Sequence, residues 1–152
     1  MFLSCQVANK DHHINQFLLD SGCSNHMTCN KMLFSTLDYS SITEIKLCDH
    51  TLVTPQGKGI LPILNKQNQK KLIHNVYYVP NLKVNLISLG QLMQNGYDVR
   101  FHDTSCTIYD KTICKRLLAR VEMTKNRVFP LILRSTNLSE SYAHTVSSQD
   151  ET

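Results

Sequence analysis

The stretch that most constrains this chain is FLLDSGCSNHMT, which covers residues 17–28. Three apolar residues lead directly into Asp20, and Ser21 and Gly22 then end the run. A short apolar run that stops at turn residues is typical of a buried strand. The backbone therefore reaches Asp20 from the core, and we expect the carboxylate to have a fixed place at the end of a strand.

An Asp-Ser-Gly turn is a weak functional signal by itself, because all three residue types favour turns for ordinary reasons. Here the apolar run before Asp20 places the carboxylate, Gly22 would let a second backbone approach closely, and Cys23 and Ser24 keep the turn small. These features favour a functional carboxylate. The motif occurs once, so a partner carboxylate would have to come from a second chain across a two-fold axis beside Asp20.

Length and composition set the broad class. A chain of 152 residues predicts one domain with tails, and 41% apolar residues are enough for a core. The apolar runs are too short to cross a membrane, so no membrane partner is expected. The N-terminal residues carry no secretory signal, which predicts a cytoplasmic location and reduced thiols for the six cysteines.

The alternation of apolar and polar residues predicts a mainly β protein. We expect strands in INQFLLD, in TEIKLCD, in TLVTPQGKGILPIL and in KKLIHNVYYVP, and a helical turn in CNKMLFSTL. The second and third runs would form a hairpin about Asp49 and His50. Pro55 and Pro62 indicate an edge strand or a projecting ribbon, because proline cannot donate to a central ladder.

One short helix is expected near residues 88–95, after an apolar strand at 84–87. Ser88 and Gln91 have the spacing of a capping box, in which the hydroxyl and the amide each satisfy a backbone N–H. Gly96 follows at the position of a left-handed C-terminal cap. Residues 97–101 and 106–110 then alternate again as strands.

The ends of the chain are predicted to lie outside the domain. Residues 1–13 are polar and are interpreted as a linker, and residues 135–152 as a disordered tail. Residues 111–134 hold seven basic residues and one acid, and are strand-rich. A solvated face is favoured over a nucleic-acid site for this segment, because no aromatic residues are interleaved for base stacking.

The segments FLLDSGCSNHMT, VYYVPNLKVNLISLGQLMQNGYDVRF and NRVFPLIL together resemble the protease segment of copia-type LTR retrotransposon polyproteins. The resemblance covers residues 14–110, and residues 111–134 would lead toward the pre-integrase region. It implies a retropepsin-like closed β-barrel, the acid protease fold, with one lobe per chain and one short C-terminal helix. It also implies an aspartic endopeptidase that works as a homodimer on a polyprotein peptide, without a cofactor.

The resemblance also assigns roles to residues. Asp20 would be the catalytic aspartate, with a water activated between the two Asp20 carboxylates of the dimer. Ser21 would brace the paired turns, and Gly22 would present its carbonyl to the substrate. The hairpin between about residues 43 and 63 would be the flap, with Asp49, His50 and Thr51 at its tip. Cys23 stands where the family has alanine, and His26 would support the turn.

Several alternatives stay open from the sequence. A catalytically inactive or domesticated retrotransposon remnant would keep the fold and act as a binding module. A ubiquitin-linked protease-like domain shares the expected fold, and nucleic acid would be a partner only through the polyprotein or a virus-like particle. Cys23, His26 and Cys29 lack the matching downstream pair of a structural zinc site, so no metal is predicted.

Overall fold

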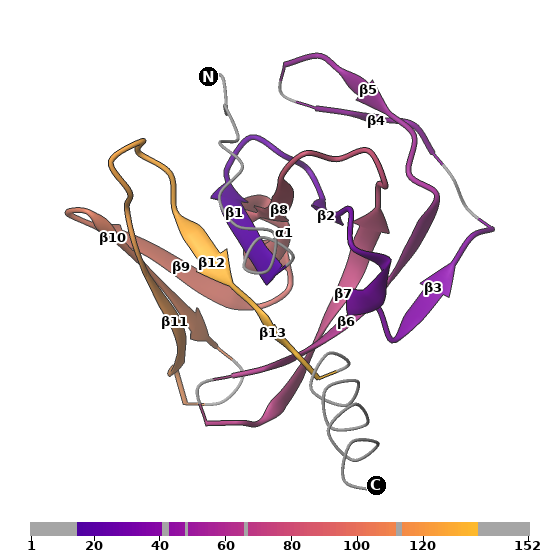
Figure 1. Ribbon diagram of the computed structural model, residues 1–152. Helices are drawn as coiled ribbons and strands as arrows, with labels where there is room; N and C mark the ends of the chain where they lie inside the picture. Colours follow the sequence, from indigo (N-terminus) through magenta and orange to yellow (C-terminus); the bar gives the residue numbers. More distant parts are fainter. Residues whose placement is uncertain (1–14, 41–42, 48, 66, 112–113, 137–152) are drawn as a thin grey trace, which may run out of the picture.

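The computed structural model describes residues 15–40, 43–47, 49–65, 67–111 and 114–136. Among these residues the protein is mainly β, with one short α-helix (Figure 1). The predicted fold class is confirmed at this level. The segments that were predicted to be a linker, at 1–13, and most of the tail, at 137–152, lie outside the described residues.

The largest sheet has eight strands and contains the two halves of the FLLDSGCSNHMT stretch. The pairs β1–β8 and β2–β7 run parallel, whereas β2 and β8 pair antiparallel. β8 therefore lies between the strand that ends at Asp20 and the strand that follows the turn. Seven strands follow one path, and β3 (Thr36–Asp38) pairs with β6 off that path. In order across the sheet the seven are β12 (Pro130–Ile132), β1 (Gln16–Asp20), β8 (Asn85–Ser88), β2 (His26–Thr28), β7 (Lys70–Tyr78), β6 (Gly57–Leu64) and β13 (Arg134–Ser135).

The last described segment of the chain lies along both ends of this sheet. β12 pairs antiparallel with β1, and β13, which follows after Leu133 alone, pairs antiparallel with β6. The sheet therefore curls, so that β1 on one side and β6 on the other both pair with the segment of residues 130–135. A closed barrel is not found: β13 has only two residues and β3 occupies the other part of the same side of β6, so the ladder is interrupted there.

Two smaller sheets complete the described fold. β9 (Tyr97–His102), β10 (Ser105–Asp110) and β11 (Arg116–Glu122) form an antiparallel sheet. β4 (Ile45–Lys46) and β5 (Leu52–Val53) form a separate two-stranded hairpin. Strands from the basic segment 111–134 thus belong to both larger sheets, since β11 pairs with β10 and β12 with β1.

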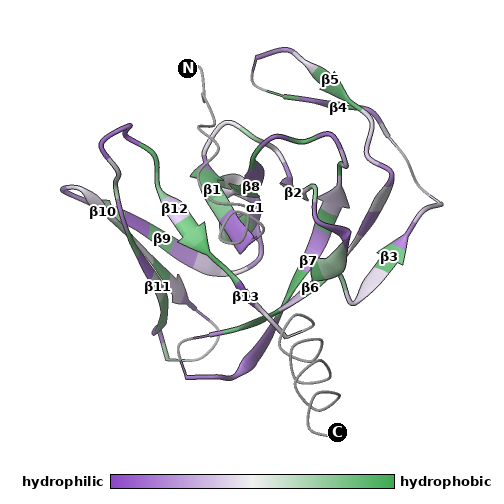
Figure 2. Ribbon diagram, viewed as in Figure 1, coloured by the Kyte–Doolittle hydropathy of each residue, from purple (hydrophilic) through white to green (hydrophobic). Residues whose placement is uncertain are grey.

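The core has two parts. The main cluster, which includes Phe17, Leu61 and Ile87, fills the space between the eight-stranded and three-stranded sheets. Figure 2 shows hydrophobic residues along the neighbouring strands β1 and β12. A smaller cluster lies under the turn that follows Asp20 and includes Leu18, Cys23, Met27, Ile45 and Leu86. Burial of each large apolar side chain of this kind stabilises a fold by roughly 1.5–3 kcal/mol.

The expectation that Pro62 marks an edge strand is wrong. β6 is a central strand that pairs with β7 on one side and with β3 and then β13 on the other. On that second side the β3 ladder ends at Ile60 and the β13 ladder begins at Ile63. Pro62 lies in this gap, where the missing N–H costs no cross-strand bond. Pro55 lies outside the strands, between β5 and β6.

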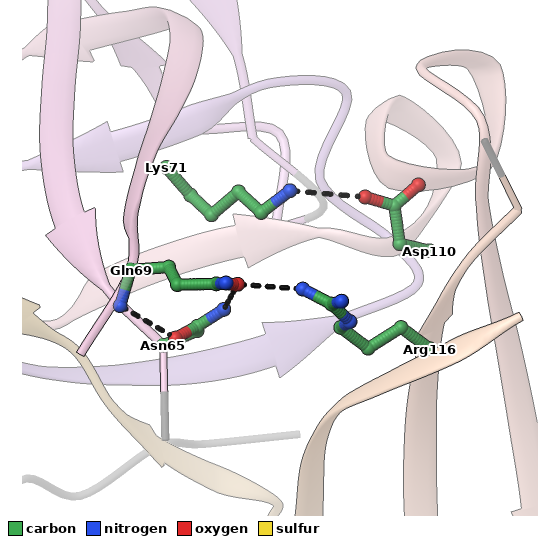
Figure 3. Close-up of polar contacts among 5 residues, drawn as sticks. All are labelled: Asn65, Gln69, Lys71, Asp110 and Arg116. Atoms are coloured by element: carbon green, nitrogen blue, oxygen red, sulfur yellow. Dashed lines mark hydrogen bonds and ion pairs between the residues drawn. The ribbon is translucent and has the colours of Figure 1, made fainter. Parts of the chain in front are cut away.

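The three-stranded sheet is joined to the β6–β7 hairpin by side chains that we call the Lys71 seam (Figure 3). Nζ of Lys71 lies 3.4 Å from a carboxylate oxygen of Asp110, and Arg116 donates a 2.6 Å hydrogen bond to Oε1 of Gln69. Asn65 accepts the backbone N–H of Gln69 at 2.9 Å and donates its side-chain amide to Oε1 of that residue at 3.1 Å. The seam consists of these five residues.

Candidate active site

Asp20 is the last residue of β1, as the sequence predicts, and its side chain folds over the following turn. Oδ1 of Asp20 accepts the backbone N–H of Gly22 at 2.8 Å. Ser21 and Gly22 are exposed, whereas Cys23 is buried and its thiol lies 3.6 Å from the carbonyl oxygen of Asp20. The carboxylate is thus half-buried, oriented by its own turn and open to solvent on the outer side.

The same local turn occurs at two other aspartates. Oδ1 of Asp38 accepts the backbone N–H of Ser40 at 2.8 Å, and Oδ1 of Asp49 accepts that of Thr51 at 2.9 Å. An aspartate that bonds to the backbone two residues on is ordinary turn chemistry. Asp20 differs from these two in its setting, because it ends a buried strand. The parallel partner strand β8 places the fully buried Ser88 in register with it.

The turn after Asp20 is held from below by Ser88. Its hydroxyl donates to the carbonyl oxygen of Cys23 at 2.7 Å and accepts the backbone N–H of Gln91 at 3.1 Å. The backbone N–H of Ser88 donates to Nδ1 of His26 at 3.0 Å. One residue therefore caps the helix α1 (Leu89–Gln94) and fixes the chain just beyond the candidate carboxylate.

Gln91 links the helix to two strands. Its Oε1 accepts the backbone N–H of His26 at 2.9 Å, and its Nε2 donates to the carbonyl oxygens of His74 and Asn75 at 3.2 and 3.1 Å. The capping-box prediction is therefore confirmed for the serine hydroxyl and wrong for the glutamine amide. The backbone N–H of Ser88 already has His26 as its partner, so the amide serves β2 and β7 instead. We refer to His26, Ser88 and Gln91 as the Ser88 hub.

Asn85 of β8 is a buried residue that supports the strands around the site, and the sequence reasoning missed it. Its Oδ1 accepts the Thr28 hydroxyl at 2.8 Å and the backbone N–H of Cys29 at 3.1 Å, and its Nδ2 donates to the carbonyl oxygen of Gln16 at 3.1 Å. It ties the start of β1 to the end of β2. An asparagine inside the apolar run VNLIS was the available signal, because a buried amide needs several partners.

The histidine of the hub is neutral at ordinary pH. Burial lowers the pKa of His26 from 6.5 to about 4, because the charged imidazolium loses its hydration. Nδ1 acts as an acceptor for Ser88, so the ring proton resides on Nε2. The role expected for His26, support of the turn, is consistent with this position between β2, β8 and α1.

The β4–β5 hairpin carries the residues predicted for the flap tip. The backbone N–H of Leu47 donates to the carbonyl oxygen of Thr51 at 2.8 Å, and His50 adopts a left-handed φ of 66°. The Thr51 hydroxyl, followed by its backbone N–H, lowers the pKa of Asp49 by hydrogen bonding to the carboxylate. Asp49, His50 and Thr51 therefore form the turn of this hairpin, as expected, while Cys48 lies outside the described residues. The expected extent of the hairpin, to about residue 63, is wrong: β5 ends at Val53, and β6 pairs with strands of the large sheet instead.

The base of the hairpin and the turn after Asp20 share one apolar cluster. Ile45 of β4 belongs to the same buried cluster as Cys23 and Leu18, and Val53 of β5 packs against it. In Figure 1 the hairpin and the connection between β1 and β2 lie toward the same end of the molecule. The base of the hairpin is thus anchored on the apolar cluster that also holds Cys23 in the turn after Asp20.

A cavity of about 440 Å³ lies elsewhere, and its walls include Ile73, Ile108 and Leu131. No residue of the Asp20 turn or the β4–β5 hairpin lines it, so it is not a site for chemistry at Asp20. The described residues bring no three His, Cys, Asp or Glu side chains together in the manner of a metal site. Nor do they include a helix long and apolar enough to cross a bilayer.

Comparison with known proteins identifies the family. The model of the Pol polyprotein beta-barrel domain matches residues 17–97, which are 81 of the 152 residues. The chain belongs to this family. The match runs from β1 through α1 to the first residue of β9, so it contains Asp20, the Ser88 hub and the β4–β5 hairpin.

The relatives of this Pol polyprotein domain are transposon proteins. The chain is 32% identical over 101 residues to a retrovirus-related Pol polyprotein from transposon RE1 of Arabidopsis thaliana, a match that covers 63% of this chain. It is 29% identical over 109 residues to the corresponding RE2 protein, covering 68% of this chain. It is also 32% identical over 75 residues to a transposon Ty5-1 protein of Saccharomyces cerevisiae, covering 49% of this chain and 48% of the yeast protein.

The chain spans about 7% of the length of each of the two Arabidopsis relatives. No solved structure matches it. The predicted resemblance to retrotransposon polyproteins is confirmed.

Proposed function

We propose that this domain is the aspartic endopeptidase of a retrotransposon Gag-Pol type polyprotein, with Asp20 as its catalytic residue. The observation that carries the proposal is the setting of Asp20. A half-buried carboxylate ends a buried strand and is oriented by Gly22, and the next residue, Cys23, is held by the Ser88 hub. A carboxylate held at a fixed point on rigid elements is what proton transfer to and from a water requires.

The active unit in this proposal is a homodimer, with a two-fold axis beside Asp20. Two carboxylates placed against each other share one proton, because adjacent like charges cannot both ionise; aspartic proteases are the standard example of this effect. Each chain supplies one Asp20, which agrees with the single occurrence of the motif in the sequence. Ser21 and Gly22 are exposed and so are available to a second chain and to a substrate backbone.

The reaction follows from that pair. The ionised carboxylate takes a proton from a water molecule, and the water oxygen bonds to the peptide carbonyl carbon while the protonated carboxyl gives its proton to the carbonyl oxygen. Return of a proton to the amide nitrogen then breaks the C–N bond and releases an acid and an amine. No covalent enzyme intermediate forms, and the chemistry needs no cofactor.

The substrate is a polyprotein segment in an extended conformation. It would lie between the Asp20 floor and the β4–β5 hairpin, where Asp49, His50 and Thr51 act as the flap tip. Backbone hydrogen bonds would give affinity, and side-chain pockets would give selection. This use of the fold corresponds to a retropepsin-type dimer in the cytoplasm, inside a virus-like particle where the element is active.

The test uses Asp20→Asn, with Asp38→Asn as the matched control. Asparagine keeps the oxygen that accepts the Gly22 N–H, so the turn is retained while the acid–base group is lost. We expect Asp20→Asn to abolish cleavage of denatured casein and self-cleavage during expression. Asp38→Asn changes an equivalent turn and keeps full activity. Wild-type turnover by folded Asp20→Asn would overturn the assignment.

Dimerisation is tested separately by dilution. The specific activity of the wild-type chain should fall as concentration decreases, together with the dimer fraction in sedimentation. Pepstatin, which mimics the tetrahedral transition state, should block the activity. Absence of any cleavage by a stable dimer at high concentration would instead favour the non-catalytic binding module.

A further inference from the structure

The Lys71 seam brings together two connections that are far apart in the sequence. One joins β6 to β7, which begins at Lys70, and the other joins β10 to β11, which begins at Arg116. The ion pair of Lys71 with Asp110 and the hydrogen bond from Arg116 to Gln69 hold the two connections beside each other (Figure 3). In Figure 1 they lie at the end of the molecule opposite the β4–β5 hairpin.

Basic residues are concentrated at this end. The guanidinium of Arg134 in β13 also belongs here, because it donates to the carbonyl oxygen of Asn65 and to Oδ1 of Asn68. The described residues of the segments 64–72, 110–118 and 133–136 contain six cations and one acid, Asp110, a net charge of +5 against +4 for the whole chain. We call these six cations the basic end: Lys70, Lys71, Lys111, Lys115, Arg116 and Arg134.

Four of these charges are available to a partner. Lys70, Lys111, Lys115 and Arg134 are exposed, whereas the other two are half-buried in the seam. In the part of the chain that the structure describes, the three exposed lysines form no ion pair, and the groups that Arg134 contacts are neutral. The partner of the basic end should therefore carry negative charge.

Acidic groups of the neighbouring strand do not cancel this charge. Asp98 of β9 lies opposite Tyr109 in the ladder, one position from Asp110. Successive residues of a strand point to opposite faces, so Asp98 faces away from the seam. It pairs there with Arg100 at 2.9 Å.

Residue type distinguishes between two classes of polyanion. Lysine is depleted at the centre of protein–protein interfaces, whereas nucleic-acid interfaces are strongly positive and hold phosphates with Lys and Arg. Three of the four exposed cations are lysines. The two connections, 65–69 and 111–115, contain no aromatic residue for base stacking, which is why the sequence of 111–134 favours a solvated face. Contacts to phosphate need no aromatic residue, and the structure adds the cations of a second segment.

We propose that the basic end binds the phosphate backbone of a nucleic acid, without reading its bases, through Lys70, Lys111, Lys115 and Arg134. A DNA duplex carries about one negative charge for each 1.7 Å of its axis, so a short duplex offers a phosphate to every one of these cations. No residue of the Asp20 turn or of the β4–β5 hairpin belongs to this surface. Binding is therefore independent of chemistry at Asp20.

The salt dependence of binding is the test. Fluorescence anisotropy of a short labelled DNA duplex measures its affinity for the wild-type chain. Four phosphate contacts predict a slope of about −3.6 for log K against log salt, so binding should weaken roughly 100-fold between about 50 and 200 mM salt. The triple variant Lys70→Gln, Lys111→Gln, Lys115→Gln keeps one contact. Its slope should fall to about −0.9, and its affinity at low salt should decrease at least about tenfold.

A matched control changes the exposed lysines Lys31, Lys46 and Lys125 to glutamine. It lowers the net charge equally outside the basic end, and it should keep the wild-type slope and bind within about threefold of the wild type. Asp20→Asn should bind the duplex as the wild type does, whatever becomes of the protease assignment. A duplex of unrelated sequence should bind equally well, because phosphate contacts carry no sequence information.

Three results would overturn the proposal. One is the absence of binding by the wild-type chain at low salt. Another is an equal loss of affinity in the two triple variants, since binding would then depend on net charge and not on this surface. The third is competition by polyglutamate as effective as that by unlabelled duplex at equal charge, which would identify an acidic protein segment as the partner.

Discussion

The Ser88 hub and the Lys71 seam are two polar networks that stabilise this fold in different ways. The hub is neutral and almost fully buried, with exposed fractions of 1% for His26, 0% for Ser88 and 7% for Gln91. The seam contains charges and is more open, since the Lys71 side chain is 23% exposed and the Arg116 contact is at the surface. The hub binds mainly backbone groups, whereas the seam mainly pairs side chains with each other.

This contrast indicates which network fixes the position of the Asp20 carboxylate. Backbone groups under the Asp20 turn have no water to replace a lost partner, so each missing hydrogen bond costs the full desolvation penalty. Charges at the seam regain water when a partner is lost, and exposed ion pairs are worth little. The position of the carboxylate should therefore depend on the neutral hub far more than on the charged seam.

The largest expected effect comes from Gln91→Met. The change keeps the volume of the side chain but removes the acceptor of the His26 backbone N–H and the donor to the carbonyl oxygens of His74 and Asn75. At roughly 1–3 kcal/mol for the buried His26 N–H and about 1 kcal/mol for each hydrogen bond to a carbonyl oxygen, the free energy of unfolding should fall by about 4 kcal/mol. Gln94→Met changes an exposed residue of the same helix and should cost less than about 0.5 kcal/mol.

Urea denaturation of both variants measures this difference. Equal stability of Gln91→Met and Gln94→Met would show that the buried amide contributes nothing beyond its volume. The comparison between hub and seam would then lose its physical basis.

Acid should weaken the hub next. The folded pKa of His26, about 4, lies below the unfolded value of 6.5, so the unfolded chain binds the additional proton first. The stability that the neutral His26 ring contributes is complete above pH 6.5 and is lost as the pH falls from 6.5 to about 4. At about 1.4 kcal/mol for each pH unit, the loss approaches about 3 kcal/mol.

His26→Asn removes this titration, so its unfolding free energy should change less than that of the wild type across the same pH window. Carboxylates titrate in both proteins and cancel in the difference. A flat wild-type curve would contradict the buried neutral ring.

The elements that could be predicted from sequence are those that depend on local patterns. The strand that ends at Asp20, the turn at Gly22 and the serine-capped helix followed by Gly96 with its φ of 89° all follow from residues within a few positions of one another. The hub could not be predicted in this way. Its bonds join residues such as His26 and Gln91, which are 65 positions apart, and only the parallel pairing of β1 with β8 and β2 with β7 brings them together.

Two mistaken expectations have the same origin. The capping-box pattern takes no account of other acceptors for the Ser88 N–H. In the structure His26 of β2 accepts that N–H in place of Gln91. The proline rule identifies positions without a donor, but it cannot tell an edge from a gap between two partner strands, as at Pro62. The pairing of Lys71 with Asp110 likewise needs two strands that are far apart in sequence.

Ser88→Ala should have a smaller effect than acid. It removes the N-terminal cap of α1, worth about 1 kcal/mol, and leaves the carbonyl oxygen of Cys23 without its buried donor. A loss of about 2 kcal/mol in unfolding free energy is expected. Ser35→Ala, which removes an exposed hydroxyl that contacts Ile60, is the control and should cost less than about 0.5 kcal/mol. A Ser88→Ala protein as stable as this control would argue against the clamp on the turn.

The smallest effect should come from the seam. Arg116→Gln removes the 2.6 Å hydrogen bond to Gln69, but water can solvate both groups at this surface position. The expected cost is below about 0.5 kcal/mol, and it should match that of Arg120→Gln, which breaks an exposed pair with Glu122 in the same strand. Unfolding at low and high salt checks both variants. A cost above about 1.5 kcal/mol for Arg116→Gln alone would mean that the short bond to the β6–β7 hairpin is shielded from solvent, and that charge as well as burial holds the two larger sheets together.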